Sequence, residues 1–351
     1  MALARAARLS LLLLTFPACA TLAPRSDEVT LPLDLDALDE RTLLRAHGHA
    51  RLAPVAGEDG VHPEREPLLL VHGLGGHPRE LQSLVDRFHD RFQIYVLAYD
   101  SLNRRTSLSG DELADEIATL AARLGPGRDV TLFAHSMGGI VARRALNRLY
   151  LGQGRRLEHL GRVRLVACDS PWQGYPGPSD RGQGRLMMGL ARPWLPDALV
   201  DMRARSSLFT GDPASADPVE RAGLLDVALP ESVEIELVFA LDGERTTPYS
   251  EGALRALPGK LAAHYARGVP MRGEAPMVNY WKSIIGSQQF YAFDVEMTAH
   301  ADAGHLDGAR AASVLARHFP KFAGDHMTVL SARRDGNGLL AHLERRFAST
   351  R

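Results

Sequence analysis

Short apolar runs alternate with amphipathic stretches along the chain from residue 67 onward. The runs with the near-continuous apolar character of buried strands are residues 67–73, 93–100, 129–135 and 162–169. Stretches with apolar residues at helical spacing lie between them, at residues 79–92, 109–125 and 138–150. Strands that alternate with helices form βαβ units. The sequence therefore predicts an α/β fold with a mostly parallel sheet and helices on both faces.

Residues 170–230 interrupt this alternation, because Pro and Gly are mixed there with large apolar residues. Such a segment is typical of a helical lid inserted between two strands, which offers an apolar wall to a substrate. The alternative is a small satellite core under a fixed loop. The side chains that would line the wall are Trp172, Tyr175, Met187, Met188, Trp194, Met202 and Phe209. The sheet is expected to resume at residues 232–243 and 288–297, and a last helix at residues 339–347.

The first 20 residues, MALARAARLSLLLLTFPACA, have the three parts of a signal peptide. Two arginines precede an apolar run that is too short to span a bilayer, and small residues follow it. Two processing routes remain open: ordinary cleavage at Ala18-Cys19-Ala20, or a degenerate lipobox in which Cys19 becomes the lipidated first residue. Both predict an exported protein, located in the periplasm, anchored to the cell envelope by lipid, or secreted.

The remaining organisation and the charge balance narrow the function. Residues 21–66 show little apolar periodicity and are interpreted as a tether and approach segment, followed by one domain at residues 67–351. Forty-one basic and 42 acidic residues give a formal net charge of −1, so nucleic acid is not an expected partner. Cys168, in an apolar run, is expected to be a buried free thiol.

Ser136 lies between a predicted strand and a predicted helix, in the run LFAHSMGGIVARRAL. The small residues around it are those that a sharp strand-to-helix turn requires if the serine hydroxyl is to stand exposed. A second Gly-rich stretch, VHGLGGHP at residues 71–78, follows the first strand of the series. Backbone N–H groups in such a stretch can stabilise an oxyanion, and the amides of Leu74 and Met137 are the expected pair.

At these residues the chain resembles the α/β-hydrolase superfamily, and within it the bacterial lipases and esterases. The resemblance rests on HGLGG, AHSMGG, SPWQG after the next strand and GDHMTVL near the end, and it covers about residues 67–348. Ala134 stands where the G-x-S-x-G pattern has its first Gly, as in some lipases of this fold. The resemblance implies a serine, acid and histidine triad in that chain order.

The expected base is His326, in a loop before the last predicted helix, and His305 is its rival. The triad acid is open between two arrangements. Asp307 fits if residues 288–297 form the strand before the acid loop, and Asp242 fits if residues 232–241 form that strand and residues 250–300 are an insertion. Further candidate acids are Asp302, Glu244 and Asp169.

These features together predict an exported serine hydrolase that cleaves carboxylic esters, with a lipid or other acyl ester as its partner molecule. A thioesterase or acyltransferase on the same site is an alternative, and a non-catalytic envelope protein that binds lipid is another. His47, His49 and His62 lack the spacing of metal ligands, so no metal or other cofactor is expected. Membrane association would come from a lipidated Cys19.

Overall fold

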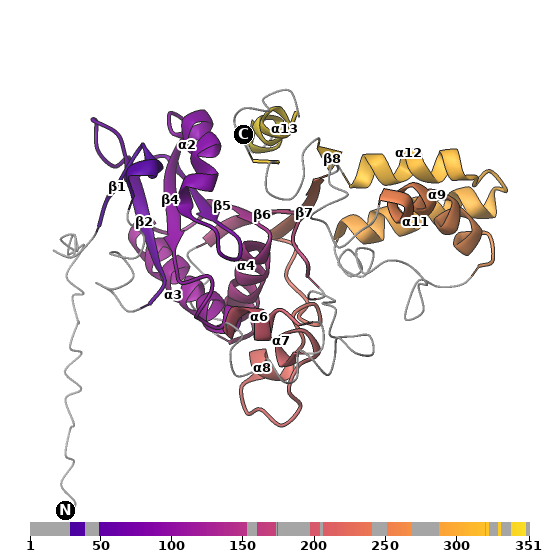
Figure 1. Ribbon diagram of the computed structural model, residues 1–351, viewed down its shortest axis with the longest axis horizontal. Coiled ribbons are helices and arrows are strands. Elements are labelled where there is room, and N and C mark those ends of the chain that lie inside the picture. The colour runs from indigo at the N-terminus through magenta and orange to yellow at the C-terminus, as the bar shows by residue number, and fades with distance from the viewer. Residues whose placement is uncertain are drawn as a thin grey trace, which may run out of the picture.

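The computed structural model places the chain around one central sheet (Figure 1). The structure describes residues 29–38, 49–152, 160–172, 174, 197–203, 206–240, 251–268, 288–319, 321–322, 329–330 and 338–348. The statements below concern these residues.

Eight strands form the sheet, in the order β1-β2-β4-β3-β5-β6-β7-β8. Their bounds are β1 Leu31–Pro32, β2 Arg51–Ala56, β3 Glu66–Val71, β4 Phe92–Ala98, β5 Arg128–His135, β6 Leu160–Cys168, β7 Val233–Ala240 and β8 Lys321–Phe322. Neighbouring strands are parallel except β2, which runs antiparallel to β4. The predicted fold class, a mostly parallel sheet in an α/β protein, is confirmed.

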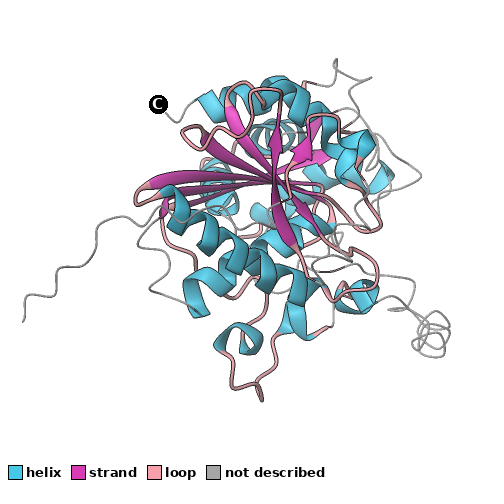
Figure 2. Cartoon of the chain, turned by 90° about the vertical axis from the view of Figure 1, so that its left-hand side faces the viewer, coloured by secondary structure: helices cyan, strands magenta, loops and turns pink. Residues whose placement is uncertain are grey.

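Helices cover both faces of the sheet (Figure 2). On one face, α3 (Thr106–Leu124) and α4 (Met137–Asn147) bury their apolar residues against the strand side chains that point to that face. On the other face lie α2 (Gln82–Phe88), preceded by the 3-10 helix η2 (Pro78–Leu81), and α13 (Leu339–Ala348). Consecutive strand residues point to opposite faces, which explains why nearly every residue of the central strands is apolar.

The sheet begins earlier in the chain than the sequence predicted. β1, followed by the 3-10 helix η1 (Leu35–Ala37), and β2 both lie in residues 21–66, the segment interpreted as a tether. β2 pairs with β4 along Arg51 to Pro54. This corrects the domain boundary at residue 67. Pro54 and the shortness of β1 hid the strands from the pattern, although Leu52 and Val55 are buried.

Residues 288–297 form a helix and not the predicted strand. They belong to α11 (Gln288–Asp302), which packs with α9 (Glu251–Tyr265) and α12 (Gly308–His318) between β7 and β8. In α11, Phe293 and Met297 are fully buried whereas Val295 is 70% exposed. A strand would put all three side chains on one face, but a helix separates Val295 from the buried pair.

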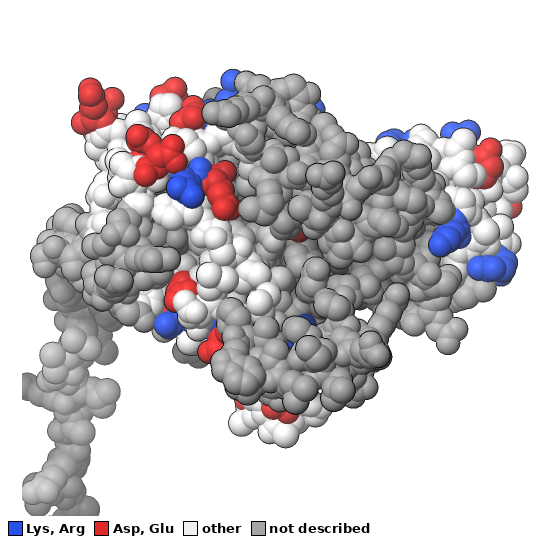
Figure 3. Space-filling view, in the orientation of Figure 1, with Lys and Arg blue, Asp and Glu red and all other residues white. Residues whose placement is uncertain are grey.

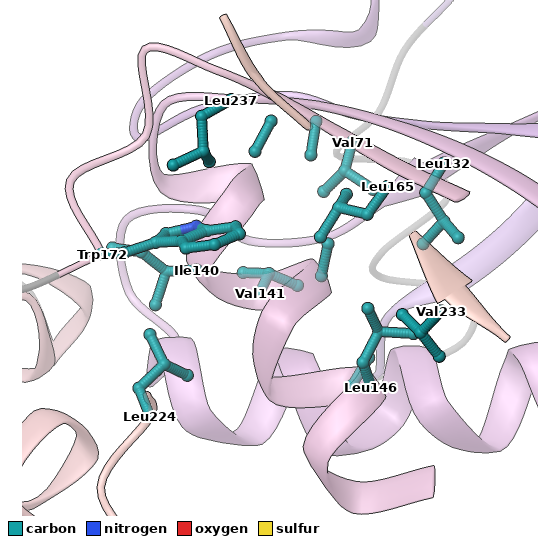
Figure 4. Packing of buried hydrophobic residues seen from close by; sticks show 14 of the residues in the cluster. Val71, Leu132, Ile140, Val141, Leu146, Leu165, Trp172, Leu224, Val233 and Leu237 are labelled. Carbon is teal, nitrogen blue, oxygen red and sulfur yellow. The ribbon is translucent and has the colours of Figure 1, made fainter. Parts of the chain in front are cut away.

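α4 lies at the centre of the core on the face of the sheet that α3 also covers. Figure 4 shows Ile140, Val141 and Leu146 of α4 facing sheet residues, with the ring of Trp172 beside Ile140. Trp172 follows β6 and is only 2% exposed, so it is part of this core. The helix that starts at the candidate serine is therefore held by extensive apolar packing.

The surface carries small separate groups of acidic and basic side chains on the face that Figure 3 shows. This agrees with a formal net charge of −1. Among the helices that the structure describes, none combines the length and the apolar character needed to cross a membrane.

Candidate active site

Ser136 occupies a strained turn between β5 and α4. Its φ is 54° and its ψ is −126°, and a residue other than glycine rarely adopts a positive φ. The Ser136 N–H donates to the Cys168 carbonyl at 2.8 Å, and the Gly139 N–H donates to the Ser136 carbonyl at 3.0 Å. The predicted sharp turn is therefore present, and strain of this kind persists only where the surrounding structure enforces it.

The glycines around Ser136 are there because backbone and side chains approach too closely for a Cβ. A Cβ on Gly138 would lie 2.5 Å from the carbonyl oxygens of both Val71 and His72. A Cβ on Gly73 would lie 2.9 Å from the Cβ of Ser136. Close packing of the Ser136 turn on the end of β3 thus explains the small residues around Ser136.

The Gly-rich stretch after β3 lies directly beside the Ser136 turn. The Gly76 N–H donates to the Gly73 carbonyl at 3.2 Å, and Gly75 has a φ of 62°. The Tyr99 hydroxyl donates to the His72 carbonyl at 2.6 Å, and the two rings stack with centroids 4.5 Å apart. The end of β4 therefore holds the end of β3 in place.

The predicted oxyanion residues flank Ser136. Met137 is its chain neighbour and is buried, and Leu74 follows Gly73, the residue whose α-carbon abuts Ser136. Ser136 itself is 7% exposed. Amides in such a buried setting can stabilise a developing negative charge more strongly than they could in water. That Leu74 and Met137 donate to an oxyanion stays a prediction.

His326, the predicted base, and Asp242, one of the two predicted acids, lie outside the described residues. Asp307 is exposed, and its carboxylate accepts the Arg310 N–H at 2.7 Å as the N-cap of α12. His305 and Asp302 are exposed as well. The arrangement that favoured Asp307 needed a strand at residues 288–297. The prediction of that strand is wrong, because these residues belong to the helix α11.

Asp169, another of the candidate acids, is among the described residues and lies next to the Ser136 turn, since the Ser136 N–H donates to the carbonyl of the preceding residue, Cys168. It follows β6 with a φ of 51°, and its N–H donates to the Val238 carbonyl at 2.8 Å. Burial, together with the nearby Asp169 carboxylate, raises the pKa of the Cys168 thiol well above its ordinary value. Cys168 is therefore a protonated buried thiol, as predicted. A positive φ at Asp169 leaves no signal in the sequence.

The described part of residues 170–230 contains three short helices, α6 (Asp197–Asp201), α7 (Ser207–Thr210) and α8 (Pro218–Arg221). Trp172 and Met202, which were expected to line a substrate wall, are 2% and 6% exposed and belong to the core. Phe209 packs against the same core. Tyr175, Met187, Met188 and Trp194 lie outside the described residues. Trp172 and Met202 therefore do not line a substrate wall. They belong to the main core and not to a separate satellite core, so neither expectation holds for these two residues.

Arginines of α4 and the π-helix η3 (Arg148–Gly152) hold this segment in place, a role that the sequence analysis missed. Arg143 donates to the carbonyls of Leu224 and Val227, the latter at 2.7 Å, and burial lowers the pKa of Arg143 to about 10. Arg148 bridges Asp111 of α3 and Asp217, the N-cap of α8, at 2.7 and 2.5 Å. These charge-assisted hydrogen bonds attach residues 217–227 to α3, α4 and η3.

In the described part of the chain, no group of three His, Cys, Asp or Glu side chains is placed to hold a metal ion.

The structure is similar to several solved hydrolases at low sequence identity. The mature form of the Bacillus licheniformis lipase BlEst2 aligns with 13% identity and a TM-score of 0.40, covering 81% of this chain and 94% of the lipase. A lipase-esterase related protein from Clostridium acetobutylicum aligns with 13% identity and a TM-score of 0.32, covering 55% of this chain and 80% of that protein. The type II thioesterase BorB of the borrelidin biosynthetic cluster aligns with 15% identity and a TM-score of 0.36, covering 81% and 93%.

No curated protein sequence is significantly similar to the chain. The structural similarities have low TM-scores and identities, so the assignment of the family rests on a family model. The model of the alpha/beta hydrolase family matches residues 68–317, which include the Gly-rich stretch after β3, the Ser136 turn and the strands from β3 to β7. The chain therefore belongs to the alpha/beta hydrolase family.

Proposed function

We propose that the protein is a serine hydrolase that cleaves carboxylic esters, with Ser136 as the nucleophile. The observation that carries the proposal is the conformation of Ser136, a non-glycine residue with a φ of 54° between a parallel strand and a helix. Neighbours without side chains allow this strained turn to pack on β3. A strained backbone conformation of this kind costs about 1–3 kcal/mol of stability and is found mainly at active sites and ligand-binding sites, so its presence at Ser136 favours a catalytic role.

We assign the remaining triad members to His326 and Asp242. β5, β6, β7 and β8 are parallel neighbours, so their carboxyl ends meet at one edge of the sheet. Ser136 directly follows β5, Asp242 is the second residue after β7, and His326 is the fourth residue after β8. Asp307 begins a helix of the insertion between β7 and β8, which supports Asp242 over Asp307.

The proposed mechanism follows from these positions. His326 accepts the Ser136 hydroxyl proton while Oγ attacks the ester carbonyl, and Asp242 stabilises the imidazolium that forms. The amides of Leu74 and Met137 donate to the oxyanion of the tetrahedral intermediate. The alcohol leaves with the proton from His326, and a water molecule, deprotonated by the same ring, then releases the acid and restores Ser136.

We propose further that residues 1–20 are an export signal and that the substrate is a lipid or another acyl ester. The charged start, the short apolar run and the small residues at 18–20 support export. Anchoring of the mature protein through a lipidated Cys19 would place the site at the cell envelope. Both statements rest on the sequence.

The test is hydrolysis of p-nitrophenyl acetate, butyrate and octanoate, with the matching acyl thioesters assayed in parallel. Wild type should hydrolyse the oxygen esters, and Ser136→Ala should reduce kcat by about a million-fold, to background. Ser313→Ala, a change of an exposed serine in α12, should keep full activity. Hydrolysis confined to thioesters would replace the ester proposal with a thioesterase, and equal rates for wild type and Ser136→Ala would refute both.

A further inference from the structure

Leu102 is a leucine that the fold holds in an exposed position. It is 42% exposed and lies in the turn after β4. The Asp100 carboxylate accepts the N–H groups of Leu102 at 3.1 Å and of Asn103 at 2.8 Å. Burial raises the pKa of Asp100, but the hydrogen bonds from Asn103 and Leu102 outweigh it and lower that pKa below its ordinary value. The turn is thus fixed by an ionised carboxylate, with its amides satisfied.

This turn borders the Ser136 site. A Cβ on Gly75 would lie 3.6 Å from Leu102 Cδ2, so the Leu102 side chain lies against the Gly-rich stretch after β3. Gly73, two residues before Gly75, abuts Ser136. Because two residues of chain span at most about 7 Å, Gly75, which the Leu102 side chain contacts, lies within about 7 Å of the residue that packs on Ser136.

The turn is also tied to the segment after β6. The Ala198 N–H in α6 donates to the Leu102 carbonyl at 3.3 Å, and Asp201 of α6 accepts the Ser107 N–H at 3.1 Å. Leu102 therefore has fixed backbone partners in two directions while its side chain remains open to solvent. Because the backbone of this turn is already fixed, binding a ligand there costs little backbone conformational entropy.

We propose that Leu102 is a specificity-determining residue that contacts the methylene chain of the ester, an inference that rests on the proposed serine hydrolase function. A bound alkyl chain would cover the exposed face of Leu102, and the removal of apolar surface from water favours such binding more for a longer chain. The Leu102 side chain lies against Gly75, the residue after Leu74, so an ester whose oxyanion is held by the Leu74 amide would extend its acyl or its alcohol chain towards Leu102. The proposal concerns apolar chains from either part of the ester.

The experiment compares Leu102→Ala and Leu102→Gln with wild type on two substrate series. One series lengthens the acyl chain, from p-nitrophenyl acetate to octanoate, and the other lengthens the alcohol, from ethyl acetate to octyl acetate. Leu151→Ala is the matched control, because Leu151 is also 42% exposed but lies in η3, beyond the far end of α4 from Ser136. Thermal unfolding of each variant checks that the fold is intact.

In at least one series, both Leu102 variants should lower the ratio of kcat/KM for the eight-carbon ester to that for the two-carbon ester about tenfold. Leu151→Ala should leave both ratios unchanged. The series that responds shows whether the acyl or the alcohol chain contacts Leu102. Unchanged ratios, or an equal loss for short and long esters, would overturn the inference while the Ser136 dependence of hydrolysis stands. Hydrolysis that is independent of Ser136 would remove the proposed function, and this inference with it.

Discussion

Glycines occupy opposite environments in two regions of this molecule. In the β5–α4 region, a Cβ on Gly138 would lie 2.5 Å from two backbone oxygens, and one on Gly139 would lie 2.6 Å from the Ser170 Cβ. In the helical insertion of α9, α11 and α12, a Cβ on Gly259 would meet no described atom within 4 Å. A glycine therefore indicates a functional turn only where another part of the backbone approaches it.

The same contrast applies to packing. α4 contacts three strands and α3, and its residues from Met137 to Asn147 are all buried. The helices of the insertion pack largely on one another, and α11 alone among them makes substantial contact with a strand, β7, in the described residues. We infer that the β5–α4 region determines the geometry of catalysis and that the insertion tolerates change.

The largest expected effect separates the two candidate acids, Asp242 shortly after β7 and Asp307 at the start of α12 in the insertion. Asp242→Asn should lower kcat for p-nitrophenyl butyrate about ten-thousandfold, because His326 would lose the carboxylate that orients its ring and stabilises the imidazolium. Asp307→Asn should leave kcat unchanged. Asn is as good an N-cap as Asp, so Asp307→Asn should also keep the stability of α12.

Circular dichroism and thermal unfolding of both variants provide the control for folding. If Asp307→Asn loses activity while Asp242→Asn keeps it, the acid belongs to the insertion and the comparison between the two regions fails. If both variants keep activity, Asp169→Asn becomes the decisive variant, because Asp169 follows the strand between β5 and β7.

A glycine-to-alanine substitution, made once in each region, should give the next largest effect, on the free energy of unfolding. Gly138→Ala should lower the free energy of unfolding by about 3 kcal/mol and reduce activity, because the carbonyls of Val71 and His72 cannot move without shifting β3. Gly259→Ala should raise the free energy of unfolding by about 0.5–1 kcal/mol, since alanine is favoured inside a helix. Urea unfolding measures both changes. A tolerated Gly138→Ala would show that the close approach is not a constraint.

Two similar charge clusters allow a smaller effect to be compared. Glu236 in β7 is 8% exposed and accepts from His342 at 2.8 Å and from Arg346 at 2.5 Å, both in α13. Glu296 in the insertion is 32% exposed, accepts from His318 at 2.8 Å and pairs with Arg317. Glu236→Gln should cost about 2 kcal/mol of stability, because it removes the buried negative charge that pairs with Arg346, and Glu296→Gln should cost less than about 1 kcal/mol.

The pH dependence of this comparison has a definite sign. Burial raises the pKa of Glu236, but the hydrogen bonds from His342 and Arg346 outweigh it, so the pKa lies below its ordinary value of 4.5. A carboxyl with a lowered pKa stabilises the fold above its ordinary pKa, and this contribution is lost as the pH falls through the lowered value. The stability difference between wild type and Glu236→Gln should therefore shrink below about pH 4.5. A difference that grows in acid would contradict this.

Sequence reasoning succeeded where local chemistry decides the structure. The turn at Ser136 needs small residues within a few positions, and the strands from β3 to β6 are continuous apolar runs, so both are visible in the chain. The short strands β1 and β8 have two residues each and are defined by the strands with which they pair.

Sequence reasoning failed where tertiary packing decides. The residues around Phe293 are rich in aromatic side chains, which favoured a strand, and the helix became recognisable only through the burial of Phe293 and Met297 and the exposure of Val295. The anchoring role of Arg143 depends on carbonyls of residues 224 and 227, which no local pattern of the sequence connects to α4. Interactions of this kind are specified by the fold as a whole.

The most direct test of the central claim, that Ser136 is an activated nucleophile, is labelling of the folded protein with a fluorophosphonate. Such reagents phosphonylate a serine that has a neighbouring base, so mass spectrometry of the digested protein should find one adduct, on the peptide that contains Ser136. Ser136→Ala should show no adduct, and heat-unfolded wild type should also remain unlabelled. The absence of labelling on the folded wild type, or an adduct on a different serine, would contradict the account.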